Sequence, residues 1–136
     1  VEQELIKLCF NPNAELRKLI NDRINTNWII NNSNRKIFSV ISIHLNSDSP
    51  PNPSILMNEL EEKERKLLAH LVIDIDELID ANINMAIDCL KRLESYWLKN
   101  TLNNLRQRLK GNITDEIEID IVSEINEIQK QLNNIL

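Results

Sequence analysis

The two histidines are the first residues to consider, because imidazole serves as a metal ligand and as an acid–base group near neutral pH. Neither His44 nor His70 has a second ligand at metal-binding spacing. The residue three before His70 is Leu67, where the E-x-x-H signature of di-iron bundles requires a glutamate. The sequence therefore predicts two helix-face histidines and no metal site.

Acidic pairs and glycine-rich loops are other common sources of catalytic chemistry. Glu61 with Glu62, and Asp74 with Asp76, stand one or two residues apart. Helical side chains at that spacing do not face each other, so surface carboxylates are expected. Gly111 is the only glycine, which excludes a loop that brings several backbone amides to a phosphate. We expect a non-catalytic chain without a cofactor.

The two cysteines, Cys9 and Cys89, lie on apolar helical faces and form no C-x-x-C pair. Redox-active and zinc-binding cysteines commonly occur in such pairs. Thiols in apolar surroundings and a reducing compartment usually stay reduced and inert. We expect both thiols to be free and buried.

Charge and hydropathy restrict the partners. The 136 residues carry a formal net charge of −5, whereas a non-specific nucleic-acid surface needs clustered Lys and Arg. The basic groups at 63–66 and 106–110 are interpreted as solvated helix faces. No apolar run approaches a membrane span, and the start does not resemble a signal peptide. We expect a soluble, cytoplasmic chain that contacts no membrane and no nucleic acid directly. Because it starts at Val1, we expect it to be a fragment of a longer protein.

Helix signals run along the whole chain, and no segment shows the period-two alternation of a half-buried strand. Asn11 is expected to cap a helix that starts at Pro12, since Asn is a favoured N-cap and Pro a favoured first-turn residue. Asn52 and Pro53 repeat this signal. The fold class is predicted as all-α, with short helices over 1–10, from 12, from 33, over 54–61 and up to 74.

One long helix is expected from Ile83 to Lys110, because this stretch contains no Pro or Gly and its apolar residues recur at helical spacing. Gly111 is predicted to end it in the left-handed conformation. Thr114 can then cap a final helix. The predicted apolar seam of that helix consists of Ile117, Ile121, Ile125, Ile128, Leu132 and Ile135.

The apolar stripe of the long helix changes direction near Trp97. Before it, Met85, Cys89, Leu93 and Tyr96 spread the apolar surface widely, as in a helix surrounded by others. After it, a narrow row remains, rotated by about 80° at 100° per residue. This row is Leu98, Leu102, Leu105 and Leu109. We therefore predict a helical bundle over 1–97 and a helical hairpin over 98–136 that share one long helix.

Two apolar residues of the final helix, Ile119 and Val122, are expected to point away from the seam. A two-helix hairpin offers them no core, so they are candidates for contact with another protein. The candidate partner-binding residues are Ile119, Val122, Gln129, Leu136, Arg106 and Lys110.

Several segments resemble one known family. Residues 2–12 read EQELIKLCFNP and residues 88–93 read DCLKRL; the continuation over 98–111 and 124–136 has the pattern of a long helix, a turn and a final helix. Together they resemble the C-terminal domain of DnaG-type bacterial replicative primases. The resemblance covers essentially the whole chain in order and spacing, and it rests on a helical pattern without an invariant signature.

The resemblance implies a bundle and hairpin that dock onto the N-terminal collar of the hexameric DnaB-type helicase and couple primer synthesis to unwinding. It places the zinc-binding and polymerase modules upstream, in a bacterial replisome or a plastid. The helicase's own N-terminal domain shares the bundle fold and is an alternative, although its usual Leu-Gly step is absent at Leu8 and Cys9. A free-standing helical adaptor is another. Upstream Toprim-like sequence would favour the primase, and a downstream Walker motif the helicase collar.

Overall fold

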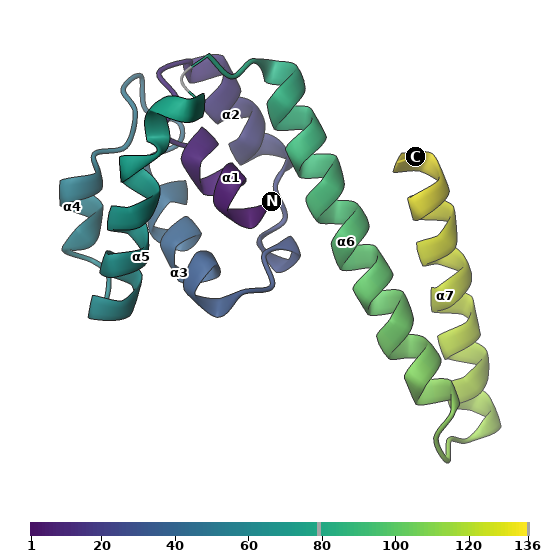
Figure 1. Cartoon of the computed structure of the whole chain (residues 1–136). Helices are drawn as coiled ribbons and strands as arrows, with labels where there is room; N and C mark the ends of the chain where they lie inside the picture. Colours follow the sequence, from purple (N-terminus) through teal and green to yellow (C-terminus); the bar gives the residue numbers. More distant parts are fainter. Residues whose placement is uncertain (79, 136) are drawn as a thin grey trace. The chain divides into compact units, whose positions relative to one another are not determined.

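The computed structural model describes residues 1–78 and 80–135, and over these residues it contains helices and connections but no β-strand (Figure 1). The predicted all-α fold class is confirmed. No helix within these ranges combines the length and apolar character that a membrane span requires. The elements are α1 (Glu2–Leu8), α2 (Ala14–Arg23), the 3₁₀ helix η1 (Thr26–Trp28), α3 (Asn32–Ser42), α4 (Pro53–Met57), α5 (Glu62–Ile73), the 3₁₀ helix η2 (Ile75–Leu78), α6 (Ile83–Leu109) and α7 (Asp115–Ile135).

The chain divides into two compact units, Val1–Leu93 and Glu94–Leu136. Each unit has its own cluster of buried apolar side chains. Helix α6 contributes residues to both clusters, and the boundary predicted after Trp97 falls within this helix.

Helix α1 lies in the middle of the first unit, where it contacts α3, α5 and η2 (Figure 1). Its Leu5 and Ile6 side chains are fully buried. Burial of one such side chain contributes about 1.5–3 kcal/mol to folding. The short helix is therefore held in place by its neighbours, because seven residues are too few for a stable isolated helix.

The Glu2 carboxylate joins the start of α1 to the start of α3. It accepts hydrogen bonds from Ile30 N at 2.9 Å, Asn31 N at 3.3 Å and Asn34 Nδ2 at 3.0 Å. The first backbone N–H groups of a helix have no partner within the helix, and the helix dipole favours a negative charge there. Glu2 thus stabilises the N-terminal end of a helix about thirty residues further along the chain.

Asparagine side chains begin most of the helices. Asn31 Oδ1 accepts from Asn34 N, Asn52 Oδ1 from Ser54 N, and Asn82 Oδ1 from Met85 N, each at 3.0 Å. The predicted cap at Asn52, with Pro53 in the first turn, is confirmed. The many asparagines therefore have a structural use, because Asn is among the best N-cap residues.

The expected start of the second helix at Asn11 and Pro12 is wrong. Helix α2 begins at Ala14, and Asn13 is its cap, with Oδ1 accepting from Glu15 N at 3.0 Å. Asn11 is buried and its Oδ1 accepts from Asn13 N at 2.9 Å, which forms a turn before the helix. The side chain expected to cap the helix is occupied by that turn.

In the second unit, α6 and α7 pack along one side of each other as a hairpin (Figure 1). Both predicted apolar rows take part, so the hairpin and its shared long helix are confirmed. Thr114 caps α7 as predicted, with Oγ1 accepting from Ile117 N at 3.3 Å. The buried residues are Leu98, Leu102, Leu105, Ile121, Ile125 and Leu132, and Trp97, Leu109, Ile113, Ile128 and Ile135 pack against them.

Ile117 is an exception to the predicted seam. Its side chain is 41% exposed, and the seam of α7 begins at Ile121. Ile113, from the connection between the helices, packs against the hairpin cluster near the turn instead. A helical periodicity counted from α7 alone cannot anticipate a side chain supplied by the connection.

The end of α6 is also reached differently from the prediction. Helix α6 ends at Leu109, but Gly111 does not have a positive φ angle. Lys110 N donates to Gln107 O and Gly111 N donates to Arg108 O. The helix therefore ends in a tighter 3₁₀ turn, in which each N–H bonds to the carbonyl three residues before it. The left-handed closure predicted for Gly111 is therefore wrong.

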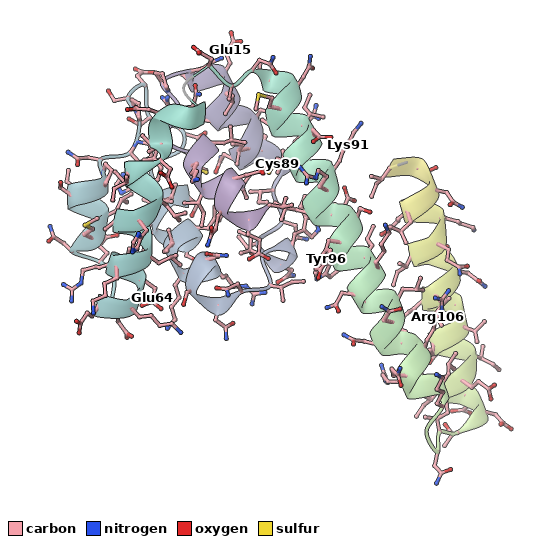
Figure 2. The ribbon with its side chains drawn as sticks, in the orientation of Figure 1. Glu15, Glu64, Cys89, Lys91, Tyr96 and Arg106 are labelled. Atoms are coloured by element: carbon pink, nitrogen blue, oxygen red, sulfur yellow. The ribbon has the colours of Figure 1, made fainter. Side chains whose placement is uncertain are left out.

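The apolar face of the first half of α6 is narrower than expected. Met85 and Tyr96 are exposed, and Tyr96 is labelled in Figure 2. The buried side chains are Ala86, Cys89, Leu90 and Leu93. Cys89 and Leu93 are thus covered as predicted, whereas the prediction that neighbouring helices also cover Met85 and Tyr96 is wrong.

Candidate protein-interaction surface

Ile119 and Val122 are exposed on the outer side of α7. The Ile119 side chain is 69% exposed and that of Val122 is 43% exposed. Residues three apart on a helix are neighbours, so the two side chains form one apolar pair. Large exposed apolar side chains that adjoin one another are commoner at binding surfaces than on ordinary solvent-facing helices.

Three other candidate residues, Arg106, Lys110 and Gln129, are also exposed. At 100° per residue, Arg106 and Lys110 lie about 70° and 110° from the centre of the α6 row. Gln129 and Val122 lie about 80° and 100° from the α7 seam in the same rotational sense. In antiparallel helices, equal rotations from the two seams reach the same flank. This flank therefore combines Val122 and Gln129 of α7 with Arg106 and Lys110 of α6.

Figure 2 labels Arg106 on the part of α6 that belongs to the hairpin. Leu136, the remaining candidate, lies outside the described residues.

The hairpin has opposite charges on its two helices. Helix α7 carries six carboxylates and one cation, Lys130, which gives it a formal charge of −5. The hairpin part of α6 with Lys110 has one carboxylate, Glu94, against Lys99, Arg106, Arg108 and Lys110, a formal charge of +3.

The acidic side chains of α7 are largely unpaired. Glu127 Oε1 lies 3.7 Å from Lys130 Nζ within the same helix. Over residues 115–135, the other five carboxylates, Asp115, Glu116, Glu118, Asp120 and Glu124, are exposed and have no cationic partner in the described part of the chain. A partner can thus meet them without displacing an internal ion pair.

The other residues considered for chemistry do not gather into a site. His44 is half-buried and His70 is exposed. Within residues 1–78 and 80–135, no three His, Cys, Asp or Glu side chains are placed to hold a metal ion. The expectations of no cofactor and no catalysis stay predictions, and the interaction surface is the candidate that the geometry offers.

Two buried charged residues were not anticipated from the sequence. Arg17 is fully buried, and its Nη1 and Nη2 donate to Asn11 O at 2.6 Å and to Ser47 O at 2.9 Å. Glu64 (Figure 2) is buried, with Oε1 lying 3.7 Å from Lys36 Nζ. Both link segments that are distant in the chain, which local periodicity does not reveal. We assign them to the bundle and not to the interaction surface.

Comparison with known proteins leaves the family open. No family model matches the chain, and no curated protein or solved structure matches it.

Proposed function

We propose that this chain is a non-catalytic interaction domain of a DnaG-type DNA primase, which docks onto the N-terminal domain of a DnaB-type replicative helicase and couples primer synthesis to unwinding. The hairpin makes the main contact. Ile119 and Val122 are its apolar anchors, with Gln129, Leu136, Arg106 and Lys110 around them.

The observation that carries the proposal is the exposed apolar pair on α7. A hairpin helix buries one stripe against its partner helix, and apolar side chains outside that stripe gain nothing from folding. Exposed anchors on an amphipathic helix are typical of recognition by a groove on another protein. The order and spacing of the segments that resemble the primase domain identify the helicase as the partner to test.

The test is isothermal titration of the full chain with the purified N-terminal domain of the helicase. Replacing the pair, as Ile119→Ser with Val122→Ser, should weaken binding by about 1–3 kcal/mol, since one or two anchor residues commonly contribute this much. Neither side chain is buried, so helicity and the melting temperature should change little.

The matched control is Ile43→Ser with Ile73→Ser. These two isoleucines belong to the first unit and are 75% and 76% exposed. The control should leave affinity unchanged, because its larger loss of exposed apolar surface occurs away from the hairpin. Unaltered affinity of the Ile119 and Val122 variant, or equal losses in both variants, would remove the hairpin as the docking surface. Absence of any binding by the unaltered chain would overturn the function itself.

A further inference from the structure

The apolar pair on α7 is bordered by acidic side chains. Asp115 and Glu116 precede Ile119 by four and three residues, and Glu118 precedes Val122 by four. Residues at these spacings are neighbours on a helix surface. All three carboxylates are exposed and lack a cationic partner in the described ranges. The surface therefore presents two apolar anchors with three carboxylates on the side of the helix N-terminus, which outnumber the two cations, Arg106 and Lys110 of α6, on the flank of Val122.

This charge pattern restricts what can cover the pair. A membrane with anionic lipids and a nucleic acid would both place negative charge against these carboxylates. A second copy docked with its α7 parallel would oppose the acidic borders of two α7 helices. With antiparallel helices the borders would stay without a cationic partner, because Ser123 and Asn126, which follow the pair on the outer side of α7, are uncharged. A segment with apolar side chains and flanking Lys or Arg complements both features.

We propose that the outer surface of α7 around Ile119 and Val122 binds a basic amphipathic helix. The apolar side chains of that helix cover Ile119 and Val122, and its Lys and Arg side chains pair with Asp115, Glu116 and Glu118. The inference rests on the proposed function in taking the helicase N-terminal domain as the first partner, and it adds that the recognised segment is basic.

The test compares two triple variants of the full chain that remove the same charge. One is Asp115→Asn with Glu116→Gln and Glu118→Gln, beside the apolar pair. The other is Asp120→Asn with Glu124→Gln and Glu127→Gln, which lie about 110–170° around α7 from the centre of the apolar pair, at 100° per residue. The first should weaken binding of the helicase domain by about tenfold and the second by less than about twofold, because contacting charges outweigh distant, screened ones.

Two probes are titrated against each variant. The first is the helicase N-terminal domain. The second is a designed amphipathic helical peptide with Leu on one face and Lys on the other, with a twin that carries Glu in place of Lys. The unaltered chain should bind the Lys peptide and not the Glu twin. Raising NaCl from about 50 to about 300 mM should weaken the Lys peptide by about tenfold.

Circular dichroism checks that the first triple variant keeps its helices, since acidic residues in the first turn also stabilise α7. If that variant loses helicity, the decision passes to Ile119→Ser with Val122→Ser, which keeps every charge and should weaken the Lys peptide by about tenfold.

The outcomes separate this inference from the proposed function. If the helicase domain still binds and the two triple variants lose affinity equally, or not at all, the recognised segment is not basic. The helicase would then remain the partner. If the Lys peptide binds with the predicted dependence on the triple variants and on salt, but the helicase domain does not bind, the inference of a basic segment would be supported. The helicase would then be overturned as the partner. Binding of neither probe would overturn both. Sedimentation showing a dimer that Ile119→Ser with Val122→Ser dissociates would also overturn the inference, because a second copy would then occupy the surface.

Discussion

Cys9 and Cys89 show how burial determines the chemistry of a side chain in this protein. Both thiols are free and buried, as the sequence predicts. Burial raises the pKa of Cys89 to about 11, and the nearby Glu4 carboxylate adds to the effect. Burial also raises the pKa of Cys9, with a further contribution from Cys89. Because the thiolate is the reactive form, both cysteines should be inert in the folded protein.

We predict slow modification of both thiols by dithionitrobenzoate at about pH 8 in the native state. For Cys89, a pKa of about 11 in place of 9.0 lowers the thiolate fraction about 100-fold, and burial slows access further. The reaction rate is followed by the absorbance of the released product. Protein unfolded in guanidinium should react rapidly at two thiols. Rapid native labelling would contradict the burial of these residues.

The same burial sets a dependence of stability on alkaline pH. The folded pKa of Cys89 lies above its unfolded value of 9.0, so the unfolded chain loses the proton first. This thiol's contribution is thus complete below about pH 9 and is lost as pH rises toward 11, by up to about 1.4 kcal/mol per pH unit. Urea unfolding of Cys89→Ala should show a shallower alkaline decline than that of the unaltered chain.

At the scale of elements, the sequence predicted those helix ends that depend on the residues of a single segment. The prediction of a helix from Ile83 to Lys110 differs from α6 only at its last residue. The Thr114 cap forms as expected. The start of α2 was misplaced because Asn11 and Asn13 are both good caps and the turn at Asn11 leaves only Asn13 available. A choice between adjacent caps depends on three-dimensional contacts.

Part of the candidate interaction surface could be predicted from the sequence, because it depends mainly on the residues of one helix. Ile119 and Val122 could be placed outside the seam because α7 packs on a single helix of its unit. Arg17 could not be assigned a buried position, because one of its acceptors is the Ser47 carbonyl, thirty residues away. Ile117 is exposed, whereas Ile113 from the connection packs against the hairpin cluster. Helical periodicity predicts the outward position of Ile119 and Val122, but not the burial of Arg17 or the exposure of Ile117.

We predict that Gly111→Ala leaves the hairpin intact. Gly111 lacks a positive φ angle, and a Cβ there would meet Arg108 O at 3.5 Å, an ordinary contact. Alanine restricts the unfolded chain more than glycine does, so the variant should be unchanged or more stable by up to about 1 kcal/mol. Thermal unfolding followed by circular dichroism measures this.

The comparison variant is Thr114→Ala, at the other end of the same connection. It removes the hydroxyl that accepts from Ile117 N and should destabilise α7 by about 0.5–2 kcal/mol. A loss of more than about 1 kcal/mol for Gly111→Ala would show that this position needs glycine after all.

At the scale of the whole molecule, the chain has two separate apolar clusters and one helix that belongs to both. The first cluster draws on α1 to α6, whereas the hairpin cluster is formed by α6, α7 and their connection. Local opening is easiest where few buried contacts hold an element. Helix α7, which packs on a single helix of its unit, is therefore expected to open more readily than α1 or α3.

We predict that core substitutions act mainly within their own unit. Leu105→Ala removes a buried side chain of the hairpin and should destabilise it by about 2–5 kcal/mol. Backbone amides of α7 should then exchange with deuterium at least about 30-fold faster, while amides of α1 and α3 change little. The reciprocal variant, Ile37→Ala, removes a fully buried side chain of the first unit and should accelerate exchange in α1 and α3 instead.

The binding proposals depend on this result in a specific way. If Leu105→Ala weakens helicase binding while exchange in α1 and α3 stays slow, the loss belongs to the hairpin, because the bundle is still folded. If that variant accelerates exchange equally in α1, α3 and α7, the chain unfolds as one cooperative unit, since two energetically separate clusters would not transmit the change. Under that outcome, the loss of binding in hairpin core variants would report global stability. Only exposed substitutions that leave both clusters intact, such as those at Ile119 and Val122, could then locate the docking surface.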